Sequence, residues 1–306
     1  MMPVIHVEQL QKSYGKVAAL QGVSFDVQEG EIFGVVGPDG AGKPTLFNIL
    51  TTLLLPDSGE VTVLNRDIRR DFLEIRKHIG YLPGTFSLYP DLTVEENLIF
   101  FATMYQSDID ANMPLIEPIW KQLLPFKKRF AGKLSGGMKQ KLALCCALIH
   151  KPILLFLDEP TTGVDPVSRK EFWEILRSIK KQNISVMVST PYMDEATLCD
   201  RIALLQAGQF IEMGTPDSII QAFKGTLITL STSDIFKLLK LMRTCEFNCT
   251  FYPYGENLHV IFYDPITEVL PQYEAFLQQN EIHYEGIKQA SPTIEDCFID
   301  IVKSKE

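Results

Sequence analysis

The chain opens with two segments in which apolar and polar residues alternate. They run from Val4 to Val27 and are separated by Tyr14-Gly15-Lys16, where glycine favours a turn. This pattern predicts two antiparallel strands at the edge of a sheet. A short apolar run, Glu31 to Val36, then ends directly at Gly37. It predicts a buried strand that leads into a glycine-rich loop and a helix beginning near Pro44.

Two more apolar runs lie in the middle of the chain. Lys151 to Leu157 is continuous and ends in Asp158-Glu159. Ile184 to Val188 follows an amphipathic helix predicted over Val167 to Lys181. Runs without alternation are typical of strands buried on both faces of a parallel sheet. Strands that alternate with helices predict a doubly wound α/β domain, with ligands bound at the carboxyl ends of the strands.

Helical periodicity dominates between Asp71 and His150, where strand signals fade. Val94 to Tyr105 and Met138 to Ile149 are the main helical segments of this stretch. We therefore expect a largely helical subdomain at about residues 85–150. Together with the strands described above, it would form a first domain of residues 1–224.

The pattern of hydrophobic and polar residues changes at Gly225, where we place the start of a C-terminal accessory domain of residues 225–306. The pattern predicts the order βαββαβα, which resembles a small α+β ferredoxin-like domain. The predicted strands begin at Thr226 and cover Cys249 to Tyr254, Leu258 to Tyr263 and Ile282 to Ile287, and the predicted helices cover Ser233 to Thr244, Thr267 to Gln279 and Thr293 to Lys303.

Composition is that of an ordinary globular protein. The 306 residues suffice for about two domains, with 46% hydrophobic and 22% charged residues. No apolar run reaches the ~18 residues of a membrane span, and the first residues do not resemble a secretory signal, so we expect a cytoplasmic protein. The net charge of −9 argues against broad nucleic-acid binding, and we expect no nucleic-acid partner.

The stretch GPDGAGKPTLFNIL, Gly37 to Leu50, resembles a phosphate-binding loop that runs into a helix. A loop G-x-x-x-x-G-K-S/T turns backbone N–H groups toward phosphates, its lysine reaches the terminal phosphates, and its hydroxyl holds Mg²⁺. Taken alone, the stretch could also be an ordinary glycine-rich turn. The residues predicted to bind a nucleotide here are Gly37, Pro38, Asp39, Gly40, Ala41, Gly42, Lys43, Pro44 and Thr45.

Three further motifs follow the loop in order. LSGG at residues 134–137 precedes the Lys151 to Leu157 run, Asp158-Glu159 closes it, and GVDP follows at residues 163–166. With Tyr14 and the loop, these motifs make residues 4–220 similar in order and spacing to the nucleotide-binding subunit of ATP-binding cassette (ABC) transporters. The resemblance implies a P-loop NTPase fold with a mixed sheet, an antiparallel β edge and a helical subdomain.

The resemblance also implies a division of roles. Two cassettes would meet head to tail, so that each ATP lies between the phosphate loop of one and the LSGG motif of the other. Tyr14 would stack on adenine, although a plain strand aromatic is the alternative, and Lys43 would bind the phosphates. Asp158 would lie on the Mg²⁺ side, and Glu159 would polarise the attacking water. The residues that would serve the partner's site are Leu134, Ser135, Gly136, Gly137 and Asp165.

Two stretches resemble the ATPases of ABC-2 type exporters in particular. They are YPDLTVEENL at residues 89–98 and PTIEDCF at residues 292–298. The resemblance implies ATP and Mg²⁺ as cofactors, a second ABC ATPase subunit as partner, identical or different, and separate membrane permease subunits. The chain would then lie on the inner face of the cell membrane, bound through the permease subunits, which largely choose the transported substrate.

Three positions depart from the pattern of this family. Pro44 replaces the Mg²⁺-binding Ser or Thr, Gly84 replaces the usual glutamine, and Pro191 replaces a switch histidine. A proline in the first helical turn spares the helix, but it removes an N–H donor and a hydroxyl. Thr45 is turned by about 100° and is not expected to replace the lost ligand. We predict ATP binding with weakened Mg²⁺ binding and impaired hydrolysis at this degenerate site.

Several interpretations stay open at this stage. The three departures suit a subunit paired with a different, competent ATPase, whereas the retained Glu159 suits a homodimer that hydrolyses ATP weakly. A sequence altered by engineering or error would also explain them. The alternatives to transport are a soluble ABC protein of translation or DNA repair and a nucleotide-sensing scaffold regulated by its C-terminal domain. The first usually has two cassettes or a long coiled coil, and neither is found here.

Overall fold

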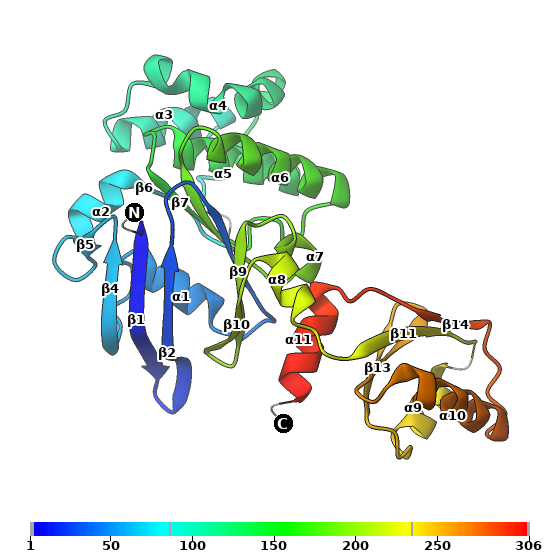
Figure 1. Ribbon diagram of the computed structural model, residues 1–306. Coiled ribbons are helices and arrows are strands. Elements are labelled where there is room, and N and C mark those ends of the chain that lie inside the picture. Colours follow the sequence, from blue (N-terminus) through cyan, green and yellow to red (C-terminus); the bar gives the residue numbers. More distant parts are fainter. Residues whose placement is uncertain (1–2, 86, 234, 305–306) are drawn as a thin grey trace. The chain divides into compact units, whose positions relative to one another are not determined.

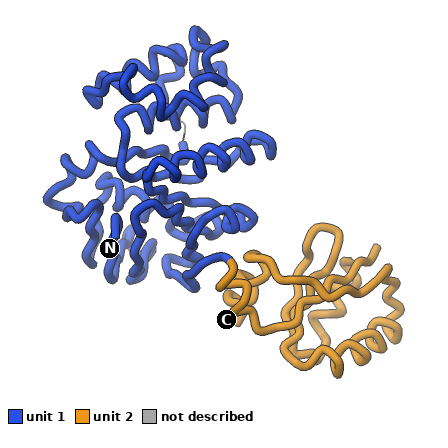
Figure 2. Tube along the Cα trace, turned by 45° about the horizontal axis from the view of Figure 1, so that its top comes forward, with its two compact units in different colours: residues 1–216 blue, residues 217–306 orange. Residues whose placement is uncertain are grey.

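The chain folds into two compact units, residues 1–216 and 217–306 (Figure 2). The computed structural model describes residues 3–85, 87–233 and 235–304. Among these residues no helix combines the length and the apolar character needed to cross a bilayer. The division into domains after residue 224 stays a prediction, as do the limits of the helical subdomain.

A six-stranded sheet forms the centre of the first unit (Figure 1). All neighbouring strands are parallel except the β9–β10 hairpin. The strands β3, β7 and β8 are buried along their whole length, which explains their unbroken apolar sequences and confirms three predicted strands. In spatial order the strands are β10 (Gln209–Gly214), β9 (Arg201–Gln206), β3 (Ile32–Val36), β8 (Ser185–Thr190), β7 (Leu154–Asp158) and β6 (Ile79–Leu82).

A second, antiparallel sheet has the order β2-β1-β4-β5. The predicted pair of strands is confirmed, because β1 and β2 pair from Ile5 opposite Val27 to Tyr14 opposite Val17. The strands of this sheet are β1 (Ile5–Tyr14), β2 (Val17–Val27), β4 (Ser58–Val63) and β5 (Arg66–Asp67). One hydrophobic cluster joins residues of both sheets with helix α1 between them, including Phe47 against Phe156 at 6.1 Å between ring centroids.

The strand β6 lies within residues 71–150, where strand signals fade and no strand was predicted. This strand has four residues, and Gly80 interrupts its apolar sequence. A Cβ atom on Gly80 would lie 2.4 Å from the carbonyl oxygen of Ala147 in a helix formed by residues 136–148, so the contact between β6 and that helix requires glycine. Because position 80 must be glycine, β6 lacks the run of apolar side chains that would predict a strand.

Helices surround the central sheet, and α3, α4 and α5 gather at one end of the unit (Figure 1). This grouping agrees with the helical segments predicted between residues 85 and 150. The helices of the first unit are α1 (Lys43–Leu50), α2 (Phe72–His78), α3 (Val94–Met104), α4 (Ile109–Leu123), α5 (Gly136–Leu148), α6 (Pro166–Lys180) and α7 (Met193–Ala196), with short 3₁₀ turns at Leu124–Phe126 and Ala131–Lys133.

The second unit is built on an antiparallel sheet with the order β12-β13-β11-β14. The predicted order βαββαβα is confirmed, although Asp234 of the predicted helix 233–244 lies outside the described residues. The last strand begins later than predicted, because the N–H of Ile282 donates to the Leu277 carbonyl of the preceding helix at 3.0 Å. The elements are α8 (Pro216–Gln221), β11 (Thr226–Ser231), α9 (Ile235–Met242), β12 (Cys249–Tyr254), β13 (Asn257–Phe262), α10 (Ile266–Gln279), β14 (Gly286–Gln289) and α11 (Ile294–Lys303).

The C-terminal motif PTIEDCF attaches α11 to the sheet of the second unit. Asp296 is fully buried, and its Oδ2 atom accepts hydrogen bonds from the backbone N–H and the hydroxyl of Thr293, both at 2.6 Å. Its Oδ1 atom accepts from the Tyr252 hydroxyl and from His259 Nδ1, the latter at 2.7 Å. One carboxylate thus caps the helix and binds two strands, which gives the motif a structural role.

Candidate nucleotide-binding site

The glycine-rich loop begins where β3 ends, and two of its glycines are required by close backbone approach. A Cβ atom on Gly37 would lie 2.2 Å from the Leu205 carbonyl oxygen. Gly42 has φ +112°, and a Cβ atom there would lie 2.5 Å from the Ala19 carbonyl oxygen. No other residue type fits these positions without moving the backbone. The loop is therefore held between strands of both sheets.

Lys43 is buried within this loop, with 1% of its surface exposed. Its ammonium donates hydrogen bonds to the carbonyl oxygens of Gly37 at 2.8 Å and Pro38 at 3.0 Å. It also forms an ion pair with Glu159 Oε1 at 3.1 Å. A buried cation at the N-terminus of a helix provides a strong site for an anion. The loop and Lys43 therefore fit a phosphate group.

Pro44 occupies the second position of α1 and is exposed. The first backbone hydrogen bond of the helix runs from the N–H of Leu46 to the carbonyl of Gly42 at 3.1 Å. Because the N–H of residue 44 would have no partner within the helix, proline removes no helical hydrogen bond. The prediction that the fold tolerates Pro44 is therefore confirmed.

Asp158 and Glu159 follow at the end of β7. Asp158 is 5% exposed, and its Oδ1 atom accepts a hydrogen bond of 2.5 Å from the Ser189 hydroxyl. Burial raises the pKa of Asp158 above its ordinary value, against the effect of that hydrogen bond. Glu159 has φ +48°, an uncommon conformation for a residue with a side chain, and its N–H donates to the Ser189 hydroxyl at 2.9 Å. Ser189 thus holds the carboxylate of Asp158 and the backbone of Glu159, a role that no sequence motif indicated.

Gly84 and Pro191 lie close to these groups. A Cβ atom on Gly84 would be 3.2 Å from the Asp158 carbonyl oxygen and 3.8 Å from its Oδ2 atom. Pro191 directly follows Thr190, whose carbonyl accepts the N–H of Gly37 at 3.2 Å. Gly84 therefore lies beside Asp158, and Pro191 follows a residue that is hydrogen-bonded to the phosphate loop. Pro44 has no hydroxyl and Gly84 has no side-chain amide, so neither position offers a side-chain oxygen, and an Mg²⁺ contact by the Asp158 carboxylate stays a prediction.

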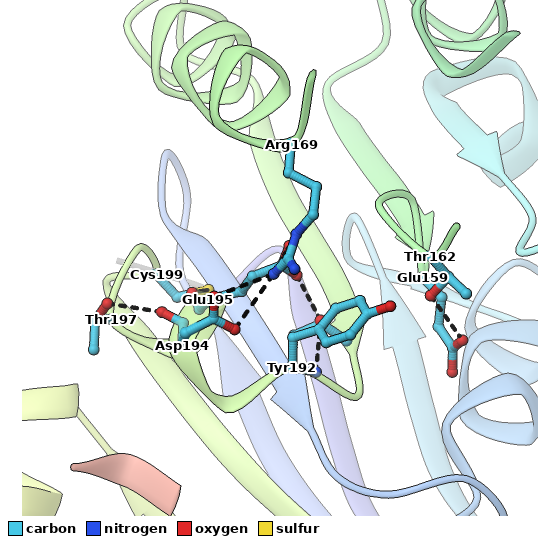
Figure 3. Close-up of polar contacts among 9 residues, drawn as sticks. Glu159, Thr162, Arg169, Tyr192, Asp194, Glu195, Thr197 and Cys199 are labelled. Carbon is cyan, nitrogen blue, oxygen red and sulfur yellow. Dashed lines mark hydrogen bonds and ion pairs between the residues drawn. The ribbon is translucent and has the colours of Figure 1, made fainter. Parts of the chain in front are cut away.

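A network that the sequence did not reveal holds the segment around Pro191 (Figure 3). Glu195 of α7 is 2% exposed, and its carboxylate accepts hydrogen bonds from the Thr190 hydroxyl at 2.5 Å and from Arg169 Nε at 3.1 Å. The Arg169 guanidinium also lies 4.2 Å from the centre of the Tyr192 ring. The residues on both sides of Pro191 are thus tied to α6.

The LSGG motif and Asp165 form the N-termini of neighbouring helices. Ser135 caps α5 and is exposed together with Gly136, whereas Leu134 is buried. A Cβ atom on Gly137 would lie 2.8 Å from the Ser168 hydroxyl, so glycine is needed where α5 meets α6. Asp165 caps α6 by accepting the N–H of Ser168 at 3.0 Å, and such bonds lower the pKa of Asp165. The exposed residues of both motifs are available to another molecule.

Tyr14 lies at the end of β1 with 51% of its surface exposed. The ammonium of Lys12 lies 5.9 Å from the centre of its ring. This exposure leaves a ring face open for stacking, and the adenine contact stays a prediction.

A glycine loop after a buried strand, a buried lysine in the next helix and a carboxylate at the end of a strand in the same sheet define a P-loop nucleotide-binding protein. The family model for ABC transporters matches residues 20–162 of this chain. Nod factor export ATP-binding protein I of Bradyrhizobium diazoefficiens is 34% identical over 304 residues, which cover 95% of this chain and 93% of that protein. The chain therefore belongs to the family of ABC transporter ATP-binding proteins.

Two further similarities agree with this assignment. The probable multidrug ABC transporter ATP-binding protein YbhF of Escherichia coli is 44% identical over 218 residues, 71% of this chain. The match covers only 38% of the length of YbhF. The dimeric structure of the ATP-binding cassette MJ0796 in a post-hydrolysis state with ADP and Pi has a TM-score of 0.62 and 26% identity, covering 69% of this chain and 98% of that chain.

Proposed function

We propose that the chain is the ATP-binding subunit of an ABC-2 type exporter, in which ATP-driven closure of two cassettes powers transport through separate permease subunits. The observation that carries the proposal is the phosphate loop with buried Lys43 facing Glu159 at 3.1 Å, in a chain whose full-length relative is an export ATP-binding protein. The stretches at residues 89–98 and 292–298 support the exporter class. A cytoplasmic chain on the inner face of the membrane follows from this function.

Each group in the site has a proposed task. Lys43 and the loop N–H groups would hold the β- and γ-phosphates of ATP, and Tyr14 would stack on adenine. Glu159 would orient and polarise the attacking water, and Asp158 would face Mg²⁺. When bound, Mg²⁺ neutralises charge on the phosphates. The buried position of Asp158 and its bond to Ser189 fix that carboxylate in place.

We further propose that hydrolysis at this chain's own site is impaired. Pro44 offers neither N–H nor hydroxyl, Gly84 offers no amide beside Asp158, and Pro191 offers no imidazole for the γ-phosphate. Losing one preorganised donor costs about 10²–10³ in rate, and combined losses come to less than their product. The exposed Ser135 and Asp165 remain suited to the site of a partner, which favours a second, competent ATPase subunit.

The second unit is proposed to be a ferredoxin-like accessory domain. Its strand order and antiparallel pairing support this, together with helices α9 and α10 in one hydrophobic cluster. We propose that this accessory domain comprises residues 225–306. A regulatory or dimerising role is the alternative use of this domain.

Hydrolysis by the purified chain tests the proposal. We expect slow Mg²⁺-dependent turnover, little gain in ATP affinity from Mg²⁺, and a rate increase of at least about 10² in the variant Pro44→Ser/Gly84→Gln/Pro191→His. Adding Glu159→Gln to that variant should abolish the gain. Robust turnover by the native chain that Glu159→Gln removes would contradict the impaired site, and failure to bind ATP would contradict the function itself.

A further inference from the structure

Helix α9 in the second unit packs one side inward and exposes the other. Leu238 and Met242 are buried in the hydrophobic cluster of this unit. Phe236, by contrast, is 83% exposed. A single exposed apolar residue needs no explanation by itself. The residues around Phe236 decide what it means.

Phe236 lines an open surface hollow surrounded by cations. The other lining residues are Lys237, Leu239, Lys240 and Arg243. Phe236 and Lys240 are spaced by four residues, so they share one side of the helix, and Arg243 lies in the turn that directly follows Met242, the last residue of α9. We call Phe236, Lys237, Lys240 and Arg243 the basic face of α9. It is a local positive surface on a chain of net charge −9.

The cations of this face differ in their contacts. Lys237 donates to the Glu281 carbonyl at 3.1 Å. Within the described part of the chain, Lys240 and Arg243 form no ion pair, and both are exposed. Their full charge is therefore available to an anionic partner.

We propose that the basic face of α9 binds the surface of an anionic phospholipid membrane, with the Phe236 ring at the level of the headgroups. An exposed aromatic ring among cations is the combination that favours the interfacial region of a bilayer. Each Lys or Arg close to an anionic surface raises binding by roughly five-fold. The proposal rests on the proposed function only for bringing the chain to a membrane.

A membrane surface suits this face better than an acidic peptide does. Peptide recognition uses a sheet edge, a groove or a pocket that selects side chains. The basic face of α9 instead presents cations and one aromatic ring on a helix of eight residues. The backbone polar groups of a helix bond to each other and do not pair with a peptide strand. A bilayer of anionic headgroups matches such a face by charge alone.

Sedimentation of the full chain with vesicles tests the proposal in the absence of permease and nucleotide. Vesicles of phosphatidylcholine alone are compared with vesicles containing about 30% phosphatidylglycerol. We expect binding to the anionic vesicles only, weakened as salt shortens the ~10 Å Debye length at 0.1 M. Lys240→Glu/Arg243→Glu should weaken binding by at least about 25-fold, and Phe236→Ala should weaken it while leaving the charges in place.

The matched control is Lys128→Glu/Lys181→Glu, which changes net charge equally at exposed positions of the first unit and should bind like the native chain. Absence of vesicle binding, or equal loss in both double variants, would overturn the proposal. Retention on immobilised polyglutamate without vesicle binding would overturn it in favour of an acidic protein partner. Because no ATP is present, these results are separate from the hydrolysis test of the proposed function.

Discussion

Replacing Asp296 with asparagine should release α11 from the sheet of the second unit. The native carboxylate accepts hydrogen bonds on both oxygens, from Thr293 on one and from Tyr252 and His259 on the other. The asparagine amide keeps one oxygen, and its NH₂ group faces either Thr293 or the pair Tyr252 and His259. In either orientation one buried donor, the Thr293 backbone N–H or the Tyr252 hydroxyl, loses its acceptor, although the shape of the side chain hardly changes.

The expected destabilisation follows from these contacts. A hydrogen bond to a charged group is worth about 1.5–3 kcal/mol, so losing one should lower the free energy of unfolding by about 1.5–3 kcal/mol. In a unit the size of residues 217–306, each kcal/mol shifts Tm by roughly 4–8 °C. The transition of this unit should therefore fall by at least about 6 °C.

The same carboxylate predicts a dependence on pH. Although burial opposes it, hydrogen bonds from Thr293 and Tyr252 hold the pKa of Asp296 below its ordinary value of 3.8. Since the folded pKa is depressed, the stabilisation is complete above the unfolded pKa and is lost as pH falls through the folded pKa. The native chain should therefore lose this stability below about pH 4, and the asparagine variant should lack that component.

Calorimetry of the full chain measures the effect, with Asp300→Asn as the matched control on the same helix. Asp300 is only partly buried and accepts one hydrogen bond from the Tyr263 hydroxyl at 2.5 Å. Its replacement should cost less than about 1.5 kcal/mol. If Asp296→Asn lowers the transition no more than Asp300→Asn does, the reasoning about the buried carboxylate is wrong.

Three further predictions concern the first unit. Gly37→Ala should abolish ATP binding measured by calorimetry, because its Cβ atom would lie 2.2 Å from the Leu205 carbonyl oxygen. The control is Gly40→Ala, whose Cβ atom meets no atom within 4 Å. This variant should cost only about 1–2 kcal/mol of backbone strain at φ +79°. Tyr14→Ala should weaken ATP binding about ten-fold, with Tyr14→Phe near native, if the exposed ring stacks on adenine. Arg169→Ala should destabilise the unit by about 3–5 kcal/mol in urea unfolding, because it leaves a buried carboxylate without its cation, and Arg169→Lys should recover part of this loss.

The sequence predicted the elements that carry a strong local signal. The strands β3 and β7 are continuous apolar runs that end at chemically distinctive residues, so their type and position could be inferred. The strand β4 begins with Ser58-Gly59, and Gly59 is required because a Cβ there would lie 2.5 Å from the Gln9 carbonyl oxygen. The alternation that predicts a strand is confined to Glu60 to Val63, which is too short a stretch to be distinctive, and β4 was missed.

The candidate site was predictable where a motif fixed several residues together. Lys43, Asp158 and Glu159 could be identified because the loop and the strand end each have a chemical pattern. Ser189 and Arg169 could not, since one is a serine inside an apolar strand and the other a cation on an amphipathic helix. Their roles depend on which side chains the fold brings near them, and a single sequence does not contain that information.

The ion pair between Lys43 and Glu159 gives Glu159 a structural role besides its proposed role in hydrolysis. The retained Glu159 was the main observation against an impaired site, because a base serves no purpose where ATP is not cleaved. Yet Lys43 is 1% exposed, and Glu159 is the carboxylate within 3.1 Å of its ammonium. Removing one partner of a buried ion pair leaves the other charge uncompensated and costs about 3–5 kcal/mol. Glu159 therefore stabilises the loop through Lys43 whether or not ATP is cleaved. The presence of Glu159 is compatible with a site that binds ATP without cleaving it.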